Sequence, residues 1–161
     1  MRVVLLAAIV AIAAAPASAG EVFSGSHLYT GTTTPWMPVA GAGYATSTMV
    51  GTFTPTAGPV PKSRIECRGA SFWTDKVSEA TGICVFGTLP DRWMLRYRMT
   101  DRDLRLQRRE RFGRRGTWTI VGGVGRYKGI KGEGTYFAVS GPATKGGRYK
   151  TMWAGEITLA K

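Results

Sequence analysis

Short segments in which apolar and polar residues alternate run through this chain, separated by glycine, proline and aspartate. Alternation with a period of two places every second side chain on one face of an extended strand, as a half-buried sheet requires. Helical spacing of apolar residues is hard to find. The pattern therefore predicts an all-β fold with about eight or nine strands. The segments expected to be strands are Ser26 to Thr33, Tyr44 to Thr54, Arg64 to Thr74, Ala80 to Leu89, Arg92 to Thr100, Leu104 to Phe112, Thr117 to Gly122, Gly132 to Ser140 and Arg148 to Ala160.

Two stretches rich in proline and glycine are expected to be loops between these strands. They are "TPWMPVAGAG", residues 34–43, and "TPTAGPVPKS", residues 54–63. Proline cannot donate a backbone hydrogen bond, so it is kept out of central strands. No linker divides the chain into halves.

The N-terminus has the features of a secretory signal peptide. Arg2 precedes an apolar run from Val3 to Ala15, and Ala17-Ser18-Ala19 follows as a small-residue cleavage site. The run is shorter than the roughly 20 residues of a membrane-spanning helix. We expect residues 1–19 to be a signal peptide and residues 20–161 to form one domain, exported to the periplasm or secreted, with no transmembrane segment.

Cys67 and Cys84 are the two cysteines of the chain, and in an exported protein they suggest a disulfide. The segments around them read as two strands joined by a turn near Asp75 and Lys76, which would place the cysteines opposite each other. Two buried free thiols are the alternative. No metal site and no cofactor are expected, because His27 is the single histidine and the chain has no Cys-x-x-Cys motif.

Residues 92–112, "RWMLRYRMTDRDLRLQRRERF", read as a hairpin that turns at Asp101-Arg102-Asp103. If both apolar sets face inward, Met99 pairs with Leu104 and Tyr97 with Leu106. The arginines then share the outer face. The residues of this expected face are Arg96, Arg98, Arg105 and Arg109, with Arg98 opposite Arg105.

Most of the positive charge lies in the second half of the chain, where seventeen basic residues face six acidic ones from Asp91 to Lys161. A solvated face that maintains solubility is one interpretation. The other is an anionic partner bound by the arginine face, whether envelope lipid, acidic polysaccharide or stray nucleic acid. Sequence-specific binding of nucleic acid is not expected in an exported protein.

The glycine-rich stretch "GTWTIVGGVGRYKGIKGEGTY", residues 116–136, fits no phosphate-binding motif. Gly123-Val124-Gly125 is followed by Arg126-Tyr127-Lys128, so the third glycine of the dinucleotide fingerprint is missing. No helical pattern follows that could offer its N-terminus to a phosphate. The glycines are expected to serve turns and strand bends.

This stretch resembles the strand, Gly-Gly-x-Gly-[Arg/Lys]-Tyr turn and Gly-x-Gly-Thr strand of bacterial proteins in the allene oxide cyclase-like barrel group, which are related in fold to plant dirigent proteins. A looser resemblance runs from Cys67 through "GICVF" to "MWAGEITL", residues 152–159. The resemblance implies a single, antiparallel, closed barrel of about eight strands. The group includes cyclases, stereochemical guides and many secreted members without assigned function, and no catalytic residue of a cyclase maps onto this chain.

Few residues form an obvious catalytic set. His27 has no nucleophile motif beside it. Glu133 and Glu156 could act as acid and base in a shared cavity. Alternation with apolar residues predicts that Glu156 points outward, and Glu133, between glycines at the edge of a turn, is expected to be solvated. Large aromatic residues could line a cavity or fill the barrel. The candidates for cavity lining are Trp93, Tyr97, Trp118 and Trp153.

Three functions remain open. The first is a non-catalytic barrel that binds a small apolar ligand or an envelope partner, and that can also associate with itself. The second is an isomerase or cyclase that acts on a hydrophobic substrate in the barrel cavity. The third is a cationic, envelope-associated protein that binds anionic surfaces. A cavity with convergent polar groups would favour the second, and a solid barrel would remove it.

Overall fold

The computed structural model describes residues 20–103, 112–140 and 149–160. The expected signal peptide, residues 1–19, lies outside the described residues. None of the helices in the described ranges is long and apolar enough to span a membrane.

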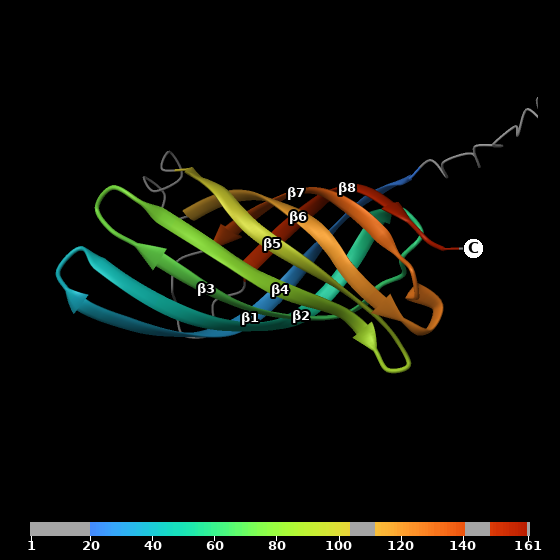
Figure 1. The fold of residues 1–161 in the computed structure, drawn as a ribbon, viewed down its shortest axis with the longest axis horizontal. Helices are drawn as coiled ribbons and strands as arrows, with labels where there is room; N and C mark the ends of the chain where they lie inside the picture. The colour runs from blue at the N-terminus through green and yellow to red at the C-terminus, as the bar shows by residue number, and fades with distance from the viewer. Residues whose placement is uncertain (1–19, 104–111, 141–148, 161) are drawn as a thin grey trace, which may run out of the picture.

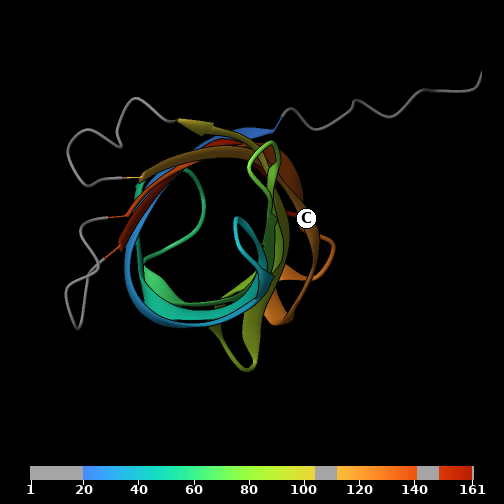
Figure 2. The ribbon, with the colours of Figure 1, turned by 90° about the vertical axis from the view of Figure 1, so that its left-hand side faces the viewer.

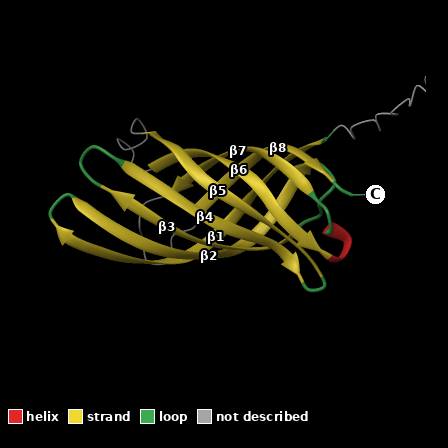
Figure 3. Cartoon of the chain, viewed as in Figure 1, coloured by secondary structure: helices red, strands yellow, loops and turns green. Residues whose placement is uncertain are grey.

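Eight antiparallel strands form a closed barrel in which each strand pairs with its neighbours in sequence and β1 pairs with β8 (Figures 1 and 2). The predicted fold class is therefore confirmed. A short 3-10 helix, η2 (Gly125–Tyr127), is the helical element of the described residues (Figure 3). The strands are β1 (Glu21–Val39), β2 (Ala42–Ala57), β3 (Ser63–Trp73), β4 (Ser78–Thr88), β5 (Asp91–Asp103), β6 (Phe112–Val124), β7 (Lys131–Ser140) and β8 (Tyr149–Thr158).

Period-two alternation assigns the two faces of the barrel wall, as β5 illustrates. Trp93, Leu95 and Met99 are buried, whereas Arg96 and Arg98 are exposed. Successive side chains of a strand point to opposite faces, so one face fills the interior and the other meets solvent. The inward and outward phases predicted for this strand are confirmed.

The hairpin predicted within residues 92–112 is wrong. Residues 101–103 continue β5 instead of turning, and Asp103 pairs with Gly113 of β6. Tyr97 pairs with Trp118, and Met99 with Gly116, so the predicted partners Leu106 and Leu104 are excluded. Asp-Arg-Asp is compatible with a turn, but in the barrel wall these three residues form the end of β5 and pair with β6. Most of the predicted strand from 104 to 112 lies outside the described residues.

The first predicted loop, residues 34–43, is also wrong. β1 continues to Val39 and β2 begins at Ala42, so a tight turn at residues 40 and 41 joins two long strands. Gly41 has φ 78°, which favours glycine. The described pairing of β1 with β8 ends at Tyr29, and beyond it β1 pairs with β2. Pro35 lies opposite Ala45 in the pairing of β1 with β2.

Residues 116–136 form the end of β6, η2 and the start of β7, as the turn interpretation predicted. Gly125 has φ 62° and Gly129 φ 77°, so both turn positions favour glycine. The Asp91 carboxylate accepts hydrogen bonds from the Arg126 backbone N–H (2.9 Å) and Nε (3.0 Å). The backbone bond, together with the positive charge of Arg126, lowers the pKa of Asp91.

Cys67 on β3 and Cys84 on β4 are directly opposed and form the predicted disulfide, with Cα atoms 4.0 Å apart. The described residues contain no free cysteine. Both half-cystines are buried, so the disulfide joins the two strands from inside the barrel.

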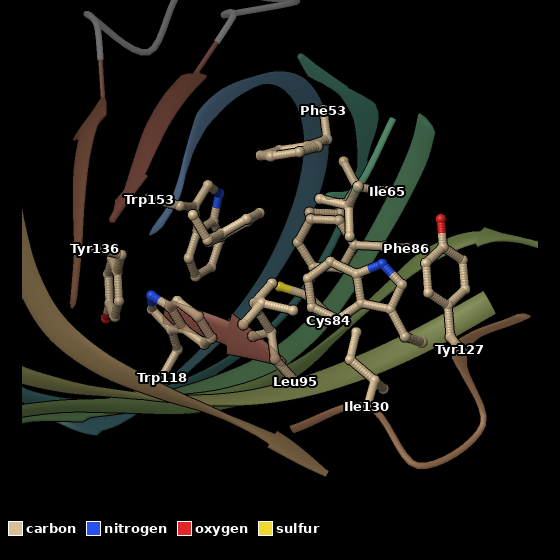
Figure 4. Close-up of a cluster of buried hydrophobic side chains, with 14 of the residues drawn as sticks. Phe53, Ile65, Cys84, Phe86, Leu95, Trp118, Tyr127, Ile130, Tyr136 and Trp153 are labelled. Carbon is tan, nitrogen blue, oxygen red and sulfur yellow. The ribbon is translucent and has the colours of Figure 1, made fainter. Parts of the chain in front are cut away.

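An aromatic core fills the part of the barrel nearest the N-terminal end of β1 (Figure 4). Phe23 lies 5.4 Å from both Phe53 and Trp118 between ring centroids, and Phe86 stacks on Trp93 at 4.0 Å. Such rings bury large apolar areas and favour stacked or edge-to-face contacts. This half of the barrel interior is filled by side chains.

Candidate functional site

A cavity of about 280 Å³ occupies the barrel interior beyond the aromatic core. Along β1 the inward residues change from Phe23 in the core to His27 and Tyr29 in the cavity wall. Along β8 they change in the opposite direction, from Tyr149 in the cavity wall to Ile157 in the core. The Cys67–Cys84 disulfide contributes to both regions and lies at their boundary. The barrel is therefore filled at one end and hollow at the other.

His27 is the most deeply buried polar residue of the cavity wall, with 2% of its surface exposed. Trp153 Nε1–H donates a hydrogen bond to His27 Nδ1 at 2.8 Å, and the two rings stack. Because Nδ1 accepts this bond, the proton of the neutral imidazole is on Nε2. Burial lowers the pKa of His27 from 6.5 to about 3. His27 is therefore a neutral ring with an Nε2–H donor that has no hydrogen-bond partner within the described ranges.

Four tyrosines continue the aromatic lining around His27. Tyr29 stacks on Tyr149 with centroids 5.3 Å apart, and Tyr97 meets Tyr136 edge to face at 5.7 Å. Burial raises the pKa of Tyr97 to about 12 and also raises the pKa values of Tyr29 and Tyr136. Tyr29, Tyr97 and Tyr136 are therefore neutral phenols at neutral pH, and each carries an O–H group.

Arg114 on β6 supplies the positive charge of the cavity wall. Its side chain lines the cavity although the residue is exposed, which places it toward the open end. Its charge opposes the rise in the pKa values of Tyr29, Tyr97 and Tyr136, which lie on three different strands. Arg115, the next residue, instead lies over the Phe137 ring on the outer face, at 5.5 Å.

The four predicted lining residues divide between the cavity and the core. Tyr97 and Trp153 line the cavity. Trp93 and Trp118 lie in the aromatic core, where Trp118 Nε1–H donates to the Thr135 and Ala154 carbonyl oxygens at 2.9 and 3.2 Å. All four side chains point inward. Their positions along the barrel axis decide whether they lie in the aromatic core or in the cavity wall.

Sequence reasoning missed part of the cavity wall. The missed residues are His27, Tyr29, Arg114, Tyr136 and Tyr149. Phe23, Gly25, His27 and Tyr29 occupy alternate positions of β1, so the period-two pattern assigns them one face. That alternation was a usable signal for His27, but nothing in the local sequence indicates that Trp153 is its partner.

The predicted anion-binding face is only partly described. Arg96 and Arg98 are exposed on the outer face of β5, where Arg98 lies between Thr81 and Thr117, and Arg96 between Ile83 and Thr119. Arg105 and Arg109 lie outside the described residues. The predicted opposition of Arg98 and Arg105 is wrong, because the neighbours of Arg98 in the barrel wall are threonines.

The two carboxylates considered for acid and base chemistry lie on the outer face of the barrel. Glu133 and Glu156 are exposed and directly opposed across β7 and β8, as their predicted outward orientation requires. Residues 20–103, 112–140 and 149–160 contain no group of three His, Cys, Asp or Glu side chains that could hold a metal ion.

A second depression of about 410 Å³ lies on the outer surface of β6, β7 and β8. Its wall includes the exposed residues Thr117, Thr135 and Met152. No buried polar side chain converges on it as His27 does on the interior cavity. The interior cavity is therefore the better candidate for a ligand site among the described residues.

Fold and cavity together define an eight-stranded antiparallel barrel that is packed by side chains at one end and contains an aromatic cavity toward the other. The sequence matches no protein-family profile and no curated protein. Among solved structures, the chain is similar to a pterocarpan synthase dirigent protein, with 11% identity, 96% of this chain and 100% of that chain covered, and a TM-score of 0.43. The barrel is assigned from the strand pairing of this chain, and the finer resemblance of residues 116–136 to allene oxide cyclase-like proteins stays a prediction.

Proposed function

We propose that this protein binds a small apolar or aromatic ligand in the barrel cavity and does not transform it. The observation that carries the proposal is the cavity of about 280 Å³ whose wall is built from His27, Trp153 and four tyrosines. Small-molecule sites are typically concave, mostly apolar, and carry a few polar groups that orient the ligand. Flat aromatic side chains would contact a ring system of the ligand.

The protonation states of the cavity wall support binding over catalysis. A general acid or base works best when its pKa lies near the pH of the reaction. Burial lowers the pKa of His27 to about 3 and raises that of Tyr97 to about 12, so neither exchanges protons readily near neutrality. Glu133 and Glu156, the carboxylates considered for a cyclase, are exposed on the outer face.

Naphthalene-2-carboxamide, a neutral aromatic probe, tests the proposal by isothermal titration calorimetry. A ligand of this size is expected to bind with a Kd on the order of 0.1 mM. Ser47→Phe fills the cavity from its wall, and Thr46→Phe adds the same ring to the outer face of the same strand. Binding should be lost in the first variant and kept in the second. Absence of saturable binding to the unmodified protein, or equal binding by both variants, would overturn the proposal.

We also propose that the chain is exported, that residues 1–19 are removed as a signal peptide, and that residues 20–161 form the mature domain. The Cys67–Cys84 disulfide supports this, because disulfides persist in oxidising compartments. The intact mass of the exported protein should correspond to a chain that starts at Gly20 and has lost two thiol hydrogens. A retained N-terminal segment would contradict the processing, and two free thiols would contradict the oxidising compartment.

Binding of anionic surfaces by the outer face of β5 is a second candidate function. Arg96 and Arg98 are exposed, and neither forms an ion pair with any described residue. Retention on immobilised heparin should weaken as salt rises, since exposed charges are screened over about 8 Å at physiological ionic strength. Replacing Arg96, Arg98, Arg105 and Arg109 by Ser should abolish that retention. Unchanged retention would leave these arginines a role in solubility only.

A further inference from the structure

We propose that the cavity binds anionic aromatic ligands, such as a carboxylate on a ring system, more tightly than neutral molecules of the same shape. The Arg114 guanidinium binds the negatively charged group of the ligand. This inference rests on the proposed binding function. It identifies the chemical class of the ligand and the residue that discriminates it.

The position of Arg114 in the barrel wall directs its charge to the cavity. Gly116 and Trp118, which follow it at alternate positions of β6, both face the interior. Arg114 shares their phase and lines the cavity, whereas Arg115 faces outward over Phe137. Two neighbouring arginines on one strand thus place their charges on opposite sides of the wall.

The positive charge of Arg114 acts on the pKa values of three tyrosines in the cavity wall. Tyr29 on β1, Tyr97 on β5 and Tyr136 on β7 each experience its positive charge. These three side chains surround the same cavity. A ligand that occupies the cavity beside them is therefore within range of the guanidinium.

The other polar groups of the wall favour a ligand that accepts hydrogen bonds. His27 offers Nε2–H, because Trp153 occupies its Nδ1, and the protonated tyrosines offer O–H groups. A carboxylate is an acceptor only, and its bonds to an arginine are charge-assisted and stronger than neutral ones. A carboxamide has the same shape but brings two N–H donors and no charge. The described lining contains Arg114 but no carboxylate that would balance it.

Naphthalene-2-carboxylate and naphthalene-2-carboxamide form a matched pair of probes for calorimetry with the full mature protein. The carboxylate should bind about five- to tenfold more tightly than the carboxamide at low salt, since the partly exposed ion pair is weaker than a buried one. Arg114→Gln should bring the ratio of the two Kd values to near one, through weaker binding of the carboxylate. Arg115→Gln removes the same charge from the outer face and should preserve the ratio.

A second variant, Arg114→Lys, keeps the positive charge and should retain most of the difference between the two Kd values. This variant tests the role of the charge even if Arg114→Gln folds poorly. Raising the salt concentration should reduce the ratio, because the guanidinium is exposed to solvent. If the two probes bind the unmodified protein with equal Kd values, this inference is wrong. It is also wrong if Arg114→Gln keeps the same ratio of Kd values as the unmodified protein. Neither result contradicts the proposed binding function. If neither probe binds, the proposed function itself fails.

Discussion

Lowering the pH from about 8 to about 5 should destabilise this protein through His27, because imidazole is the side chain whose ordinary pKa lies in that interval. The chain has a single histidine. In the folded state His27 is 2% exposed, and its Nδ1 accepts the hydrogen bond from Trp153 at 2.8 Å. Protonating Nδ1 would break that bond and bury a charge, so the folded barrel holds the ring neutral.

The direction and size of the effect follow from proton linkage. Burial lowers the pKa of His27 to about 3 in the folded state, from the ordinary value of 6.5 that it has in the unfolded chain. Since the folded pKa is depressed, the unfolded chain binds the extra proton first, and stability is lost progressively as pH falls below 6.5 toward 3. Between about pH 8 and about pH 5 the loss is about 2 kcal/mol, or roughly 7 °C in Tm for a chain of this size.

Urea and thermal unfolding at the two pH values measure this loss. His27→Gln is the matched variant, because an amide oxygen can still accept the Trp153 N–H but does not titrate. Its stability should change much less with pH over the interval, because the variant lacks the imidazole. Equal pH dependence in the variant and the unmodified protein would refute the assignment of a buried, neutral His27.

Three further predictions concern the barrel wall and the core. Removing the disulfide by the double substitution Cys67→Ala and Cys84→Ala should lower the free energy of unfolding by about 3 kcal/mol, as expected for a cross-link between residues 17 apart; unchanged urea midpoints would contradict it. Gly155→Ala should cost about 1–3 kcal/mol, because the added Cβ would clash with the Glu133 carbonyl oxygen and lie 2.7 Å from Trp118 Cζ2, whereas Gly122→Ala, with no atom within 4 Å of the new Cβ, should be tolerated. Trp118→Phe should destabilise the core by about 2 kcal/mol through the lost N–H donor and ring volume, and calorimetric melting would show no change if the indole were dispensable.

The local sequence pattern predicted most strands, where apolar and polar residues alternate without interruption. The alternation around Cys67 and Cys84 was sufficient to predict their opposition, because a tight hairpin relates residues close in sequence. It failed at residues 101–103, where Asp-Arg-Asp resembles a turn. There the pairing of β5 with β6, between residues 10 or more apart, determined the conformation. Hairpin pairing with β2 also extends β1 through a stretch whose prolines favour a loop, with Pro35 opposite Ala45 and Trp36 opposite Tyr44.

The sequence by itself determined the strand class, the inward and outward phase of β5, the disulfide and the turn role of the glycines at 125 and 129, since each depends on residues close together in the chain. Only the tertiary structure decided which inward aromatic residues fill the barrel and which surround a cavity. Trp93 and Trp153 both point inward, yet Trp93 stacks on Phe86 while Trp153 holds His27, which is 126 residues away. The neighbours of an inward side chain come from strands across the barrel, and period-two alternation carries no information about how far along the barrel axis each strand places its residues.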